Sequence, residues 1–382
     1  MKRAAAVLVA VGTVALAGGA ARSDSYVTLR GQYYKEDSTR VVQPVVELSK
    51  DLPNGVQVRA YYLLDAITSA SAASGPSGDT IFTEYRNETS LEVSKEWSRV
   101  KAGLAYRYSA ESDYWSHTLR AFASLKTWSD TGTLSLSFGR GWDQVGRRVQ
   151  GAAPSPVSNP CVPTGSETCP LDITFGGVGY SQVLFPTVLA QAGYEVMYLD
   201  GYLASPYRTV ASMGLEKVPR KRLRNAVSGR VAKYLPATRT GLQLHYRYYW
   251  DLYPGTSPDQ VPPGDPWHVR SHTFEGRVFQ EVGSTVELRF TGRLYLQGAA
   301  DFWCQPASCY TGHDLYTSDP KLAKVTTTFL EGKIYWEAVR WRELAFLRWF
   351  SAGTFELSYG HFAQSTSFGG AHVLQAGYTF PF

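Results

Sequence analysis

The chain has 382 residues, of which 44% are hydrophobic and 19% are charged. Its mean hydropathy of −0.22 excludes a protein made of membrane-spanning helices, each of which needs about 20 consecutive apolar residues. A membrane barrel needs an apolar residue only at every second strand position, so it is compatible with this value. The formal net charge of +5 is too small to indicate nucleic-acid binding.

The first 21 residues resemble a secretory signal peptide. Lys2 and Arg3 precede an apolar stretch from Ala4 to Ala17, and small residues follow up to Ala21. A transmembrane anchor is the alternative, but the apolar stretch is Ala-rich and short for a membrane span. We therefore expect cleavage near Ala21 and a mature domain covering 22–382.

The mature chain alternates between strand-like segments and connections. In 240–252 and 286–296, apolar and polar residues alternate at every position, and the segments have the length of about 10–14 residues that a tilted membrane strand needs. A β-sandwich would also tolerate such alternation, but its strands are usually shorter. Short turns are expected at 51–55, 96–99, 129–132, 185–187, 235–240 and 281–284, and long loops at 68–79, 146–171, 201–221, 253–267 and 299–322.

Short turns on one side and long loops on the other are typical of an antiparallel up-and-down β-barrel in the bacterial outer membrane. The segments predict an all-β transmembrane barrel of about 16 strands with both ends of the mature chain in the periplasm. Residues 339–350 form either a short amphipathic helix or part of a strand, which would change the count.

Charged residues occupy the polar face of several predicted strands. The pore-lining candidates are Arg247, Arg277, Arg289, Arg293 and Glu287. In an open barrel such charges set the ion preference, and the excess of arginine predicts a preference for anions; in a filled barrel they bind one another.

The four cysteines form two local pairs, Cys161 with Cys169 and Cys304 with Cys309. Both pairs lie in Pro- and Ser-rich segments of a chain that is expected to be exported, so we expect disulfides in two external loops. A metal or haem site is the alternative, but the sequence has no Cys-x-x-Cys pair.

The last residues resemble the C-terminal insertion signal of outer-membrane barrels, which the barrel-insertion machinery reads. Gln375 and Gly377 are followed by Phe380 and the terminal Phe382, and the aromatic residues share one face of the last predicted strand. Such a face is suited to contact with outer-membrane lipid. Pro381 departs from the pattern because proline has no backbone N–H to donate to the neighbouring strand, but this loss matters little at the end of a strand.

Further motifs carry a family resemblance. Residues 181–184, 198–208 and 246–249, together with 65–71, are similar to a bacterial outer-membrane family known only as a domain of unknown function. Its members are often encoded near a small lipoprotein and an FAD:protein FMN transferase, which implies these partners and a role in envelope redox systems.

The segment from Asp65 to Ser71 is also similar to the flavin-acceptor motif Asp-x-x-Ser/Thr-Gly-Ala-Ser/Thr. The resemblance implies Ser71 as the acceptor of a covalent FMN and Asp65 as the acidic residue of the motif. Ser69 departs from it, because the motif has glycine there. The alternative is a surface loop of small residues without any cofactor.

No catalytic or metal-binding motif is recognised, because the seven histidines are scattered without a metal-ligand spacing. The sequence therefore predicts a non-enzymatic outer-membrane barrel. It is either an envelope component linked to flavin-dependent redox systems or a porin-like channel for small, preferentially anionic solutes.

Overall fold

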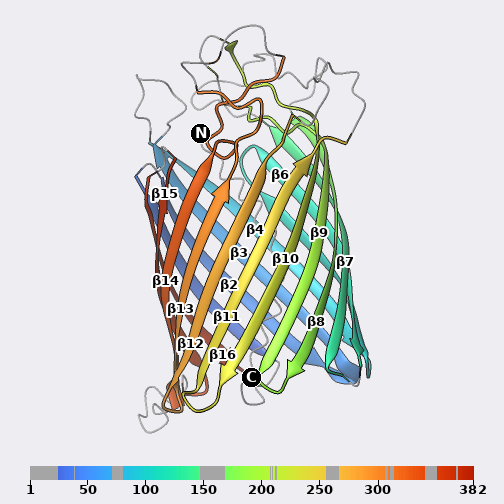
Figure 1. Cartoon of the computed structure of the whole chain (residues 1–382), viewed down its shortest axis with the longest axis vertical. Coiled ribbons are helices and arrows are strands. Elements are labelled where there is room, and N and C mark those ends of the chain that lie inside the picture. The colour runs from blue at the N-terminus through green and yellow to red at the C-terminus, as the bar shows by residue number, and fades with distance from the viewer. Residues whose placement is uncertain are drawn as a thin grey trace.

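Sixteen antiparallel strands form one closed barrel in the part of the chain that is described (Figure 1). The computed structural model describes residues 25–37, 39–70, 81–128, 130–146, 168–206, 208, 210, 213–254, 266–305, 309, 314–339, 351–366 and 369–382. Each strand pairs with its neighbours in the sequence, and the first pairs with the last. The predicted signal peptide lies outside these residues, whereas the predicted fold class and strand count are confirmed.

The strands are long, as membrane strands must be. Their bounds are β1 Tyr26–Glu36, β2 Thr39–Leu52, β3 Val56–Ala70, β4 Ile81–Glu96, β5 Val100–Ala110, β6 Tyr114–Thr127, β7 Gly132–Gly146, β8 Thr168–Phe185, β9 Val188–Gly201, β10 Lys221–Leu235, β11 Thr240–Leu252, β12 Arg270–Val282, β13 Val286–Gln297, β14 Val325–Glu337, β15 Thr354–Gln364 and β16 Ala371–Pro381. Among the described residues, no helix has the length and apolarity to span a membrane.

One end of the barrel carries the tight turns. The short helix η1 (Pro53–Gly55) joins β2 to β3, and Asn54 and Gly55 there have φ values of 64° and 72°. A Cβ on Gly55 would lie 2.6 Å from the carbonyl oxygen of Glu96, so this Asn-Gly turn needs glycine. The described ends of β14 and β15 leave residues 338–353 as a connection; most of the ambiguous segment 339–350 lies outside the described residues.

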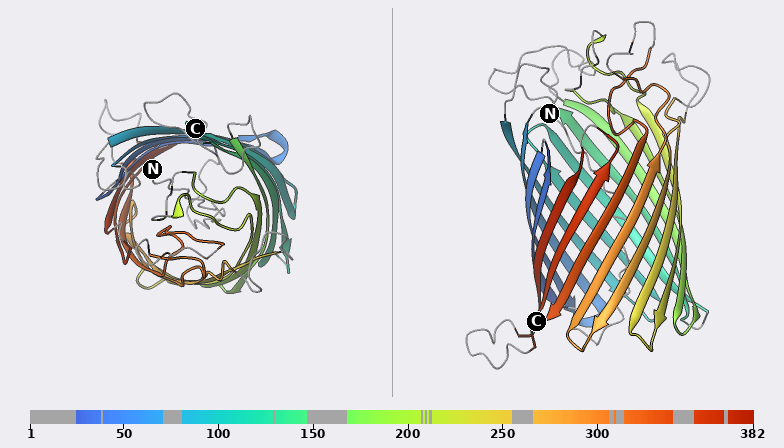
Figure 2. Two further views of the ribbon diagram at one scale, coloured as in Figure 1. Left: turned by 90° about the horizontal axis from the view of Figure 1, so that it is seen from above. Right: turned by 60° about the vertical axis from the view of Figure 1, so that its left-hand side comes forward.

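The opposite end carries the long connections, and by the barrel rule it faces outward from the cell. Figure 2 shows the described parts of two of them, within 202–220 and 298–324, at this end, with the C-terminus at the other end. Between them, the wall has two distinct faces. Apolar side chains point outward along every strand, as with Leu244 (70% exposed), Leu330 (68%) and Phe290 (54%). Polar and charged side chains alternate with them and point into the lumen.

A small apolar cluster lies at the outward end of β7, β8 and β9, near the long connections. It contains Val145, Leu171, Met197 and Leu199 together with the fully buried Cys169. The expectation that Cys169 lies in a loop is wrong: β8 begins at Thr168, because the residues after it continue the pairing with β7. Cys169 is disulfide-bonded, and Cys161 lies outside the described residues.

Candidate functional site in the lumen

The pore-lining candidates converge on the luminal side of β11, β12 and β13. Arg277 and Arg293 both bind the carboxylate of Glu275, at 2.7 and 2.8 Å. Arg289 is paired with Glu287 on its own strand, and Arg247 lies 3.4 Å from Glu195 on β9. All five residues therefore face the lumen and form ion pairs there. Arg293 reaches Glu275 because the two residues are directly paired in the register of β12 and β13.

In the pairs that Glu275 forms, the carboxylate is much less exposed than the guanidinium groups, whereas Glu287 and Glu195 are about as exposed as Arg289 and Arg247. The Glu275 side chain is 7% exposed, whereas Arg277 and Arg293 are 32% and 38% exposed. On other strands the carboxylate is again less exposed than its arginine partner, as with Glu356 and Arg30 and with Glu88 and Arg107. At Glu275, Glu356 and Glu88 the carboxylate thus lies closer to the wall than the arginine that binds it.

A luminal cavity of about 170 Å³ is bordered by this basic wall between β12 and β14. Its rim includes Arg277, Arg289, Arg293 and Lys333. Aromatic rings support these cations: the Arg289 guanidinium lies 4.0 Å from the ring centre of Tyr335, and that of Arg293 lies 5.4 Å from the centre of Phe329. Contact with an aromatic face restricts a guanidinium and keeps its donors pointed at an anion.

Two connections fold over the outward mouth and form what we call the cap. It comprises the described parts of 202–220, between β9 and β10, and of 298–324, between β13 and β14. Seen from above, their yellow-green and orange traces lie within the ring of strands (Figure 2). Lys217 and Tyr316 form an antiparallel bridge between the two segments, and the Tyr316 hydroxyl donates to the carbonyl of Met213 at 3.0 Å.

Glu216 joins the cap segments internally. Its buried carboxylate accepts hydrogen bonds from the Thr317 hydroxyl at 2.6 Å and from the Ser205 amide, and it lies 3.4 Å from Arg208. Burial raises the pKa of Glu216 above its ordinary value, against the opposing effect of Arg208. Burial likewise lowers the pKa of Lys321 in the second segment.

The rim beneath the cap is held by an ion pair. Arg222 on β10 binds Asp251 on β11, with Nε at 2.9 Å from the carboxylate, and neither side chain is more than 10% exposed. Trp267 covers this pair, its ring centre 4.1 Å from the guanidinium, and its indole nitrogen donates to the Lys221 carbonyl at 2.8 Å. The rim is therefore a rigid support for the cap.

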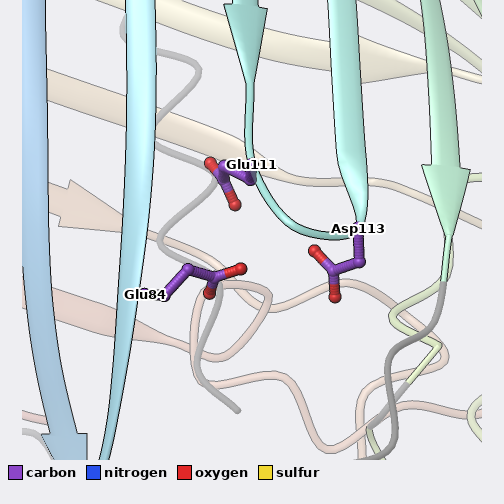
Figure 3. Close-up of side chains that lie close together, drawn as sticks. All are labelled: Glu84, Glu111 and Asp113. Atoms are coloured by element: carbon purple, nitrogen blue, oxygen red, sulfur yellow. The ribbon is translucent and has the colours of Figure 1, made fainter.

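Three carboxylates gather at the outward end of β4 and β5. Glu84, Glu111 and Asp113 point toward one another, and their nearest oxygens all lie within 4.8 Å (Figure 3). Oxygen ligands of this kind suit Ca²⁺ or Mg²⁺, but exposed acidic groups are common without an ion. Spacing gave no signal for this cluster, because Glu84 reaches it from a neighbouring hairpin.

Of the two flavin-motif residues, only Asp65 lies in the described part of the chain. Asp65 is 2% exposed within β3, where it forms an ion pair with Arg86 and accepts a hydrogen bond from Gln43. Its carboxylate therefore points into the lumen. Ser71, the expected acceptor, lies outside the described residues.

The other two groups of predicted residues have clear places. The structure joins Cys304 to Cys309 by a disulfide within the cap. Of the insertion-signal residues, Gln375 donates to Glu356 at 3.0 Å, and Gly377 lies directly against that carboxylate. Phe382 is 47% exposed and its amide donates to the Ser25 carbonyl at 3.0 Å, and Phe380 shares its outward face.

Comparison with known proteins gives a family match and fold relatives. The profile of a family described as "Protein of unknown function (DUF3570)" matches residues 172–339, from β8 to the end of β14. This agrees with the expected resemblance to an outer-membrane family of unknown function. No curated protein matches the sequence.

Solved structures that resemble the barrel over nearly all of this chain include two with TM-scores above 0.5. One is a "Bacterial polysaccharide outer membrane secretin", 8% identical, with a TM-score of 0.52 over 95% of this chain and 99% of that chain. The other is CdiB from Acinetobacter baumannii, 10% identical, with a TM-score of 0.51 over 94% of this chain and 60% of that chain. Identities this low show the fold alone. With its outward apolar belt, the chain is an integral β-barrel of the bacterial outer membrane.

Proposed function

We propose that this barrel is a non-enzymatic channel for small anionic solutes, and that the cap narrows its entrance. The observation that carries the proposal is the layering of luminal charge, in which acids such as Glu275 are buried beneath Arg277 and Arg293. An anion passing the wall would meet several guanidinium groups that are about one-third exposed, such as those of Arg277 and Arg289. Several weak sites in a row permit conduction, whereas one deep site would retain the ion.

The test is single-channel recording of the purified, folded protein in a planar bilayer with a salt gradient. We expect discrete steps and a reversal potential that shows anion preference. Replacing Arg277, Arg289 and Arg293 together by glutamine should shift the reversal potential towards cation preference. The matched control is Lys233→Gln, which removes one positive charge from the outward face of β10 and should leave the reversal potential unchanged. Folded protein that never conducts, or a triple variant with unchanged selectivity, would contradict the proposal.

A flavin-linked role in the envelope has less support from the described residues. The motif acid Asp65 is already bound by Arg86 and Gln43 and is inaccessible from outside the barrel. The role stays a prediction for Ser71. In-gel flavin fluorescence after co-expression with an FMN transferase tests it, and a Ser71→Ala variant is the control.

A further inference from the structure

A row of basic side chains lies on the outward face where the two ends of the sheet meet. Arg40 on β2 pairs in register with Lys35 on β1, Lys35 with His372 on β16, and His372 with His361 on β15. All four side chains are exposed. We call this set the basic row. Neighbouring strands are about 4.8 Å apart, so the row extends over about 14 Å.

The basic row lies at the upper edge of the apolar belt. One outward position further toward the turn end, the same strands carry Val42, Leu374 and Tyr359, which are 47%, 47% and 53% exposed. Below them the outward face continues with residues such as Leu29 and Leu357. The row is thus placed at the level of lipid headgroups in the outward leaflet, with its neighbours already in contact with acyl chains.

The basic row differs from the luminal bases in its partners. Luminal arginines such as Arg293 and Arg30 each have a carboxylate partner. Within the described part of the chain, neither Lys35 nor Arg40 forms an ion pair. Like charges at directly paired positions of a sheet repel each other, so this arrangement favours an anion that joins them.

Two nearby acids do not fill that role. The carboxylate of Glu36 points inward and accepts a hydrogen bond from Tyr34 at 2.9 Å. Asp37 lies against Gly369, since a Cβ on that glycine would be 3.0 Å from its carboxylate oxygen. Of the two histidines, His372 forms a hydrogen bond between its Nδ1 and the Tyr359 hydroxyl, 2.8 Å apart. This bond fixes the orientation of the His372 ring.

We propose that the basic row binds the phosphate groups of a phosphorylated lipid in the outward leaflet. Phosphate oxygens accept several charge-assisted hydrogen bonds at once, which Arg40 and Lys35 donate and the His361 and His372 rings extend along the same line. The lipid chains lie over Val42, Leu374 and Tyr359. A lipid is favoured over a free anion because the apolar belt directly adjoins the charges.

The test uses nanodiscs of phosphatidylcholine with a small fraction of lipid A, which carries phosphate on its sugars, and detects bound lipid by native mass spectrometry. The wild-type barrel should retain lipid A and release its dephosphorylated form. The double variant Lys35→Gln/Arg40→Gln should bind lipid A at least about tenfold more weakly, a change of about 1.4 kcal/mol. The conservative variant Lys35→Arg/Arg40→Lys should restore most of the binding.

The matched control is Lys95→Gln/Lys233→Gln, which removes two outward lysines near the turn end and should bind lipid A normally. Heat-modifiable migration in gels shows that each variant is folded. Equal loss in this control, equal retention of dephosphorylated lipid A, or displacement of lipid A by millimolar inorganic phosphate would each overturn the proposal. Unchanged binding by the folded Lys35→Gln/Arg40→Gln variant would overturn it as well.

Discussion

The carboxylate of Glu275 lies beneath the guanidinium of Arg293, 2.8 Å from its Nε, and is shared with Arg277. One nearly buried acid thus supplies a single negative charge to two cations on the luminal side of adjacent strands. Replacing Glu275 by glutamine changes the net charge of the luminal wall while keeping the shape of the side chain.

Glu275→Gln should therefore increase the anion preference of the channel, in the direction opposite to the arginine variants. It leaves Arg277 and Arg293 without their main counter-charge, so we also expect a loss of stability of about 1 kcal/mol, reduced by the exposure of both arginines. The reversal potential and the heat-modifiability temperature measure the two effects. An unchanged reversal potential in a folded variant would show that these arginines do not contact the permeating ion.

The cap should be most stable in acid. Because burial raises the pKa of Glu216 above its ordinary 4.5, the folded cap binds more protons than the unfolded segments. This stabilisation is complete below the ordinary pKa and is lost as the pH rises through the raised one. Lys321, whose pKa burial lowers, contributes to the pH dependence with the opposite sign.

Recording the channel between about pH 5 and about pH 8 tests this, because opening of the cap should become more frequent as the pH rises. Glu216→Gln keeps an uncharged side chain at every pH and should flatten the dependence. Glu281 forms an ion pair with Arg239 at the turn end, far from the cap. The control variant Glu281→Gln should therefore show the same pH dependence of opening as the wild type. A wild-type response in the opposite direction would refute the assignment.

Removal of the Cys304–Cys309 disulfide should loosen the cap and spare the barrel. The bond closes a short loop, with a sequence separation of 5, so it stabilises the folded segment by about 2 kcal/mol. Cys304→Ser/Cys309→Ser should thus be cut faster by external protease within 298–324. Its heat-modifiability temperature should remain that of the wild type. A large fall in that temperature would mean that the cap supports the strands.

Gly377→Ala should destabilise the closing strand. The added Cβ would lie 2.7 Å from the Glu356 carboxylate, which must then move away from Arg30 and Lys333. We expect a loss of about 1–3 kcal/mol, measured by urea unfolding of the detergent-folded protein. Gly31→Ala on the adjacent β1 is the matched control, because a Cβ there meets nothing within 4 Å. Equal losses in both variants would contradict the packing argument.

The wall was predictable from the sequence because alternation directly reflects which residues meet lipid. The faces of 240–252 and 286–296 agree with the structure, and so does the number of strands. Contacts that depend on strand register were not predictable. Arg293 reaches Glu275 from the neighbouring strand, and Glu84 on β4 meets Asp113 in the turn after β5, so no spacing within one strand records these contacts.

The cap was also beyond the sequence patterns. Its segments were expected only as long loops, because irregular backbone has no periodicity in the sequence. The contact between Glu216 and Thr317 joins residues that are 101 positions apart in the sequence. Cys169 was misplaced for a related reason: a Pro-rich stretch conceals where a strand begins, and only the pairing of β8 with β7 extends it to Thr168.

The pairing of β1 with β16 has a consequence for the order of assembly. Eleven residue pairs join these strands, from Tyr26 with Pro381 to Glu36 with Ala371, and they bring together opposite ends of the sheet. None of these bonds is available to a partly delivered chain, and closing so large a loop is entropically costly. The basic row crosses this junction, so its four side chains come together only in a finished barrel. A lipid that binds the basic row would therefore bind only the closed barrel, and its binding would stabilise the pairing of β1 with β16.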